Sequence, residues 1–215
     1  MTDFRARAPG ATYMPAIWIL VGIMAALELM FQITDAMGRG YLRFIAQQML
    51  GVRPDLAWSL TGDFPLQPFV VFFSHAFLHG GLVHLAMNAT VLLAVGSVVV
   101  TVTGQRSAVI LFLLCAVAGG ALFAVLNAGQ TLYLVGASGG VFGYLAAWKR
   151  WELQVLKHRK LPVDKVRTFL LALLAVNVAL MFVYPNVSWE AHLGGFAAGW
   201  LIAPRLRRRH LGYRE

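Results

Sequence analysis

The chain contains six apolar stretches, which are separated by polar or glycine-rich segments. They cover residues 15–34, 83–103, 107–128, 137–148, 166–184 and 191–204. A helix needs roughly 20 apolar residues to cross the hydrocarbon core of a bilayer, so the fourth and sixth stretches are short. Only helices and closed barrels satisfy their backbone groups in lipid. The pattern predicts an all-α polytopic membrane protein with six transmembrane helices.

Composition and charge agree with this prediction and orient the helices. The chain is 59% hydrophobic and 13% charged, which is more apolar than a typical soluble domain. Its net charge of +9 would suggest nucleic acid in a soluble protein. With both termini in the cytoplasm, however, all but three of the 18 Lys and Arg residues (Arg39, Arg43 and Arg53) fall on the cytoplasmic side. We therefore expect no nucleic-acid partner, and a multi-pass protein of a bacterial inner (cell) membrane.

Three segments are expected along the chain. Residues 1–14 form a cytoplasmic segment that is too polar for a signal peptide, and residues 15–205 form the membrane domain. Residues 206–215 form a basic cytoplasmic tail, which we expect to touch anionic lipid head groups. The lone Cys115 lies within the third apolar stretch, so no disulfide within the chain is possible.

The longest connection, residues 36–82, lies on the outer side and is not typical of a solvated loop. Its segment YLRFIAQQML has apolar residues at helical spacing, which is typical of a helix lying in the membrane interface. The segment FPLQPFVVFF that follows is too apolar for a solvated loop and too short to span. We expect this connection to be partly embedded in the outer leaflet.

A serine begins the fourth apolar stretch, in the segment GASGGVFGYLAAW. From Ser138 to Trp148 the helix would rise about 15 Å. Lys149 and Arg150 mark its cytoplasmic end, so Ser138 is expected near the middle of the membrane. The preceding NAGQTLYLVGA must then enter the bilayer without helical structure, which is tolerated only inside protein or beside a water-filled cavity.

The sixth stretch repeats this arrangement with a histidine. His192 lies about 20 Å of helix above Arg205, at a depth similar to that of Ser138. Small residues allow the two helices to approach closely, through Gly139 and Gly143 on one and Gly195 and Gly199 on the other. A hydroxyl and an imidazole at matched depth are a candidate nucleophile and general base.

Polar residues also stand at the start of the second stretch. His84 and Asn88 are four residues apart and share one helix face. Such groups are costly in lipid, and they are suitable donors for the negative charge that develops in acyl transfer. His75 and His79 come earlier and are expected to order the loop. For Glu28, near the outer end of the first helix, we expect a structural partner in the outer loop.

These motifs resemble those of the rhomboid intramembrane serine proteases. Residues 136–139 are similar to the family's GxSG, and residues 191–199 to its AHxxGxxxG. The set His79, His84 and Asn88 has the spacing of its second-helix motif. The resemblance implies a rhomboid-like six-helix bundle with a partly embedded outer loop. It also implies cleavage of single-span transmembrane proteins near their outer membrane boundary, within the lipid bilayer and without a cofactor or metal.

The resemblance also implies residue roles. Ser138 would be the nucleophile and His192 the base of a dyad, with Phe142 packed on the imidazole. Contacts to the oxyanion and the substrate would come from His84, Asn88 and Gly136, with His79 in support. One departure concerns how the outer loop is anchored, because Val70-Val71 stands where the family often has Trp-Arg.

Other interpretations remain open. GASGG also fits the nucleophile elbow of soluble hydrolases, but no strand precedes it. A triad acid is not evident either: two of the three acids between Ser138 and His192 are on the cytoplasmic side, and Glu190 is expected to point elsewhere. A rhomboid-like binder that does not cut its clients and a small transporter are the alternatives from other classes. The substrate and the oligomeric state are not predicted.

Overall fold

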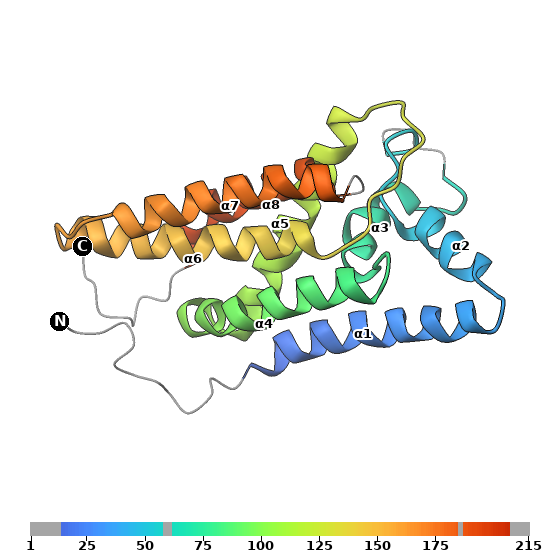
Figure 1. The fold of residues 1–215 in the computed structure, drawn as a ribbon, viewed down its shortest axis with the longest axis horizontal. Coiled ribbons are helices and arrows are strands. Elements are labelled where there is room, and N and C mark those ends of the chain that lie inside the picture. The colour runs from blue at the N-terminus through green and yellow to red at the C-terminus, as the bar shows by residue number, and fades with distance from the viewer. Residues whose placement is uncertain (1–13, 58–61, 185–186, 207–215) are drawn as a thin grey trace.

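The computed structural model describes residues 14–57, 62–184 and 187–206, and its architecture is helical (Figure 1). The six predicted helices are confirmed: α1 (Pro15–Ala36), α4 (Leu82–Thr103), α5 (Gln105–Leu126), α6 (Ser138–His158), α7 (Asp164–Val183) and α8 (Trp189–Leu206). In the described residues the only β-type pairing is an isolated bridge between Val52 and Leu134. Residues 1–13 and 207–215, nearly all of the predicted N-terminal segment and basic tail, lie outside the described residues.

The long connection between α1 and α4 contains further helices. The predicted interfacial helix is α2 (Tyr41–Leu50), and the apolar segment after it forms α3 (Gln67–Ser74) followed by a 3-10 turn, His75–Phe77. Both helices lie at one end of the bundle (Figure 1). We call the end at which α1 finishes and α4, α6 and α8 begin the loop face.

The helices differ in how well they could cross a membrane alone. By length and composition, α1, α4, α5 and α7 are apolar enough to span, whereas α6 and α8 do not meet this criterion. These two helices contain the fourth and sixth apolar stretches, which the sequence had already shown to be short. Helix α6 nevertheless continues past Trp148 to His158. It does so because its last ten residues are good helix formers and still bury Trp151 and Val155.

Glycine residues bring α6 against α8 at the predicted positions. A methyl group on Gly195 would overlap the carbonyl oxygen of Gly139, and one on Gly199 would overlap that of Gly143. The contacts follow the same order on both helices, so the helices run parallel. Helix α5 approaches α8 in the same way, because a methyl group on Gly119 of α5 would lie 2.6 Å from the Ala191 carbonyl oxygen. Helices α5, α6 and α8 therefore touch through their backbones.

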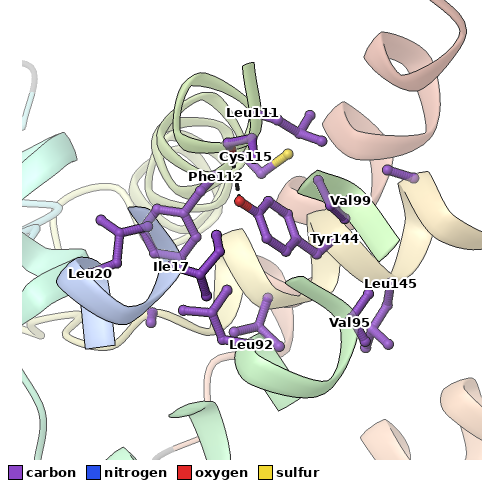
Figure 2. Close-up of a cluster of buried hydrophobic side chains, with 14 of the residues drawn as sticks. Ile17, Leu20, Leu92, Val95, Val99, Leu111, Phe112, Cys115, Tyr144 and Leu145 are labelled. Atoms are coloured by element: carbon purple, nitrogen blue, oxygen red, sulfur yellow. Dashed lines mark hydrogen bonds between the residues drawn. The ribbon is translucent and has the colours of Figure 1, made fainter. Parts of the chain in front are cut away.

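The apolar core lies between α1, α4, α5 and α6 (Figure 2). At its centre the fully buried Tyr144 donates a hydrogen bond from its hydroxyl to the carbonyl oxygen of Ala108, at 2.7 Å. The rings of Tyr144 and Phe112 meet edge to face. Cys115 is buried beside Gly143 and is fully enclosed. This core fixes the helices that carry the candidate site.

Helix α7 is peripheral. Among its side chains only Val166 is buried. Near its start, Phe169 packs edge to face on Trp148, with ring centroids 5.6 Å apart, and lies 4.4 Å from the Lys149 ammonium. Most of the remaining surface of α7 is apolar and exposed, as expected for a helix that faces lipid.

Candidate active site

Ser138 is the first residue of α6, and the chain reaches it without helical structure, as predicted. Two contacts hold this approach in place. Val52 and Leu134 exchange backbone hydrogen bonds of 3.1 and 2.9 Å, and the Gly136 N–H donates to the His75 carbonyl oxygen at 2.9 Å. The long connection between α1 and α4 therefore positions the start of α6.

Gly136 has a conformation and a neighbour that only glycine tolerates. Its φ is +128°, and a Cβ at this position would lie 2.7 Å from Cε1 of His84. The His84 imidazole consequently lies against the backbone two residues before Ser138. The structure thus joins one predicted site residue of α4 to the segment that carries Ser138.

His192 lies in the first turn of α8 and is 6% exposed. Its ring stacks on Phe142, with the ring centroids 4.0 Å apart and the planes at 8°. Phe142 is one helical turn after Ser138 and so lies on the same face of α6. His192 therefore covers the face of α6 on which Ser138 stands. The Nδ1 atom of His192 is 2.6 Å from the Asn177 side-chain oxygen.

The side chains of Ser138 and His192 are not hydrogen-bonded to each other. Ser138 is half-buried, and its hydroxyl makes no hydrogen bond within the part of the chain that the structure describes. Catalytic hydrogen bonds are often long in structures without substrate and tighten when substrate binds. The structure brings the two residues to one helix face and leaves the hydroxyl available.

The other predicted site residues form a cluster on α4 and the turn before it. Asn88 is buried, and its amide donates to the His84 carbonyl oxygen at 3.1 Å. His79 meets His84 edge to face, with ring centroids 5.1 Å apart. Both ring nitrogens of His79 are buried without a partner among the described residues. The buried ring of His75 lies 2.9 Å from the Val71 carbonyl oxygen, consistent with an ordering role in the loop.

The long connection is anchored by an ion pair. Arg43 of α2 donates to the buried Glu28 of α1 from both terminal guanidinium nitrogens, Nη1 and Nη2, at 2.8 and 3.1 Å. It also binds Asp35 at 2.8 Å and the His79 carbonyl oxygen at 3.1 Å. The predicted partner of Glu28 in the loop is thus Arg43. This arginine supplies an anchor in a chain whose α3 carries Val70 and Val71 instead of Trp-Arg.

Removing Glu28 should loosen this connection. Breaking a buried ion pair by removing one partner leaves an uncompensated charge and costs on the order of 3 kcal/mol. We expect Glu28→Ala to lower the thermal midpoint in detergent by several degrees. Arg53→Ala is the matched control, because it removes the more exposed Arg53–Asp55 pair and should cost about 1 kcal/mol or less. Equal midpoints for the two variants would show that Arg43 does not anchor the loop through Glu28.

Asn177 was not predicted from the sequence. The available signal was a single amide within the apolar helix α7, and intramembrane polar residues are functional candidates by default.

Glu190, in contrast, behaves as expected and points away from His192. It accepts hydrogen bonds from Asn127 at 3.1 Å and from the Ser188 hydroxyl at 3.0 Å.

The fold and the site define a helical membrane protein in which a buried histidine packs on the helix face that begins with Ser138. The sequence model of the rhomboid domain matches residues 67–209, which include every predicted site residue. The chain belongs to the rhomboid family.

Relatives come from a plant and a bacterium. The chain is 36% identical over 139 residues to RHOMBOID-like protein 4 of Arabidopsis thaliana, covering 63% of this chain and 34% of that protein. It is 28% identical over 129 residues to the rhomboid protease GluP of Bacillus subtilis (strain 168), covering 60% and 24%. RHOMBOID-like protein 5 of Arabidopsis thaliana is 28% identical over 142 residues, covering 63% and 44%. The chain thus spans less than half of the length of these relatives.

Family membership and the protease relative support an intramembrane protease, and the apolar helices support an integral multi-pass membrane protein. Because the relatives come from both a plant and a bacterium, the bacterial inner membrane stays a prediction.

Proposed function

We propose that this chain is an intramembrane serine endopeptidase that uses Ser138 as nucleophile and His192 as general base. The observation that carries the proposal is the stacking of His192 on Phe142, which places the imidazole over the face of α6 that begins with Ser138. Membership of the rhomboid family supports the same reaction class.

The proposed reaction proceeds in two steps. The Ser138 hydroxyl oxygen attacks the peptide carbonyl while Nε2 of His192 takes the hydroxyl proton. His192 then gives this proton to the departing amine, and the C–N bond breaks to leave an acyl-enzyme. In the second step a water molecule loses a proton to His192 and attacks the ester carbonyl. Ser138 departs as the alcohol with that proton, and the acid product is released.

The negative charge on the carbonyl oxygen needs donors in each step. The Ser138 backbone N–H is free of helical partners because it lies at the first residue of α6, where the helix dipole also favours an anion. His84 lies against the Gly136 backbone, and Asn88 is buried one turn after His84 on α4. We assign these three donors to the oxyanion hole.

Labelling by a serine-directed fluorophosphonate in detergent tests the proposal. The intact protein should be labelled and should cleave a single-span substrate, and Ser138→Ala should do neither. Labelling that persists in Ser138→Ala would place the reactive serine elsewhere. A folded protein without labelling or cleavage would support a binder that does not cut its clients.

The loop face is proposed to be the outer side of the membrane, with both termini in the cytoplasm. The proposed substrate is a single-span protein whose scissile segment unwinds near that side, because a fully hydrogen-bonded helix cannot offer its carbonyl group. Helix α7 is the proposed entry gate, since Val166 is its only buried side chain. The end of α7 at the loop face carries Phe182, which is 82% exposed.

Reducing the bulk of the gate should speed cleavage. We expect Phe182→Ala to raise the rate for a membrane-embedded substrate several-fold, because less side-chain volume obstructs entry. Leu171→Ala is the control, since it removes an exposed side chain of α7 further from the loop face. Replacing helix-weakening residues of the substrate by leucine should slow cleavage in all variants. Rates that respond equally to both substitutions would argue against a gate at Phe182.

A further inference from the structure

The contact between Asn177 and His192 joins two parts of the molecule that otherwise barely meet. Helix α7 is packed at its start through Val166 and Phe169. Further along, Asn177 reaches His192 at 2.6 Å. In the described part of the chain, no other side-chain hydrogen bond joins α7 to a neighbouring helix.

The direction of this hydrogen bond determines the form of the imidazole. The side-chain oxygen of an amide can only accept, so an Asn177 placed with its oxygen toward the ring assigns the hydrogen to Nδ1 of His192. In the neutral ring, Nε2 is then unprotonated and free to act as a base. Stacking on Phe142 fixes the plane of the ring, and the bond to Asn177 fixes its rotation within that plane.

Among the residues that the structure describes, no carboxylate takes the position of Asn177 beside His192. The nearest acid in sequence, Glu190, is held by Asn127 and Ser188. A neutral amide orients the ring without adding a charge inside the bundle, where an unpaired carboxylate would be costly.

We infer that Asn177 is the positioning residue of His192: it selects the ring form with Nε2 free and makes the competence of the base depend on the position of α7. When α7 moves away from α8, the hydrogen bond is lost and the imidazole can rotate. When α7 returns, the base is restored. This inference rests on the proposed function, because it assigns a role to Asn177 in that reaction.

The first test observes the ring directly in the full chain. Protein labelled with 15N-histidine in detergent is compared with Asn177→Ala, and His192→Gln identifies the His192 signals. We expect the wild-type spectrum at neutral pH to show hydrogen on Nδ1, and Asn177→Ala to show a mixture of both ring forms. Hydrogen on Nε2 in the wild type would overturn the inference, because the amide would then be donating to Nδ1 through its nitrogen.

The second test uses kinetics with matched variants. Asn177→Ala should lower kcat about tenfold, the effect of one neutral hydrogen bond, with little change in KM. Asn177→Asp keeps the acceptor oxygen and should restore most of kcat. In the pH profile of kcat for Asn177→Asp, the fall in rate on the acid side should move to higher pH, because a carboxylate stabilises the protonated imidazole. Val178→Ala, an exposed neighbour on α7, is the control and should match the wild type.

These results separate the inference from the proposed function. If Asn177→Ala cleaves and titrates like Val178→Ala, the positioning role is wrong while the protease remains. If the wild type neither cleaves nor reacts with fluorophosphonate, the proposed function fails. The 15N spectrum would then still show whether Asn177 sets the ring form. A loss of thermal stability alone, with kcat and the pH profile unchanged, would make Asn177 a helix contact only.

Discussion

Replacing Ser138 or His192 by alanine should abolish cleavage, and replacing both should cost no more than replacing one. In the proposed mechanism either single change removes the proton transfer on which attack depends, and the expected loss in kcat is on the order of 10⁶-fold. Residues that act as one unit are non-additive, so the double variant tests whether the two form a dyad. Rates are to be measured with a purified single-span substrate in detergent and in liposomes.

Two controls match these changes elsewhere in the chain. Ser97→Ala removes a hydroxyl from α4 that bonds only within its own helix, at the Ala94 carbonyl oxygen. His158→Ala removes an imidazole from the far end of α6. Both should cleave normally. Losses at Ser138 and His192 that multiply in the double variant would show that the two residues act independently.

Replacing Gly136 by alanine should lower kcat by on the order of 10²-fold or more. The added methyl group would collide with the His84 ring, and the φ of +128° is one that alanine rarely adopts. The strain costs about 1–3 kcal/mol. Displacement of His84 or of the Ser138 N–H removes an oxyanion donor, which by itself costs about 10²–10³ in rate.

Gly129→Ala provides the comparison for this prediction. Gly129 lies in the same non-helical segment with a φ of +78°, but a methyl group there would meet nothing within 4 Å. Both variants carry backbone strain, and only Gly136→Ala disturbs His84. If the two variants lose activity to the same degree, backbone strain in the segment explains the effect and His84 is not a donor.

The long helices could be predicted from the sequence because hydropathy reports directly on burial in lipid. The far end of α6 could not be read from hydropathy, since Lys157 and His158 continue the helix beyond its apolar part. Helix α3 was predicted only as an embedded segment, because a short apolar segment such as FPLQPFVVFF does not distinguish a helix from another buried conformation.

The placement of the candidate residues on their helices was predictable where motifs fixed the spacing within a helix, and not where contacts joined distant segments. Ser138, His192 and their glycine neighbours follow from positions along α6 and α8. Glu28 could be assigned a loop partner in general, but only the fold identifies Arg43. Asn177 shows the same limit, since a lone amide in an apolar helix does not indicate which residue it will bind.

The backbone contact between α6 and α8 has a consequence for how such a protein can adapt. At Gly139–Gly195 and Gly143–Gly199 the separation of the helices is set by peptide atoms, which are the same in every sequence. The exposed surface of α1 can therefore change to suit bilayers of different thickness or lipid content without altering the separation of α6 and α8. Adaptation to a new membrane and preservation of the proposed catalytic geometry are in this way assigned to different parts of one small chain.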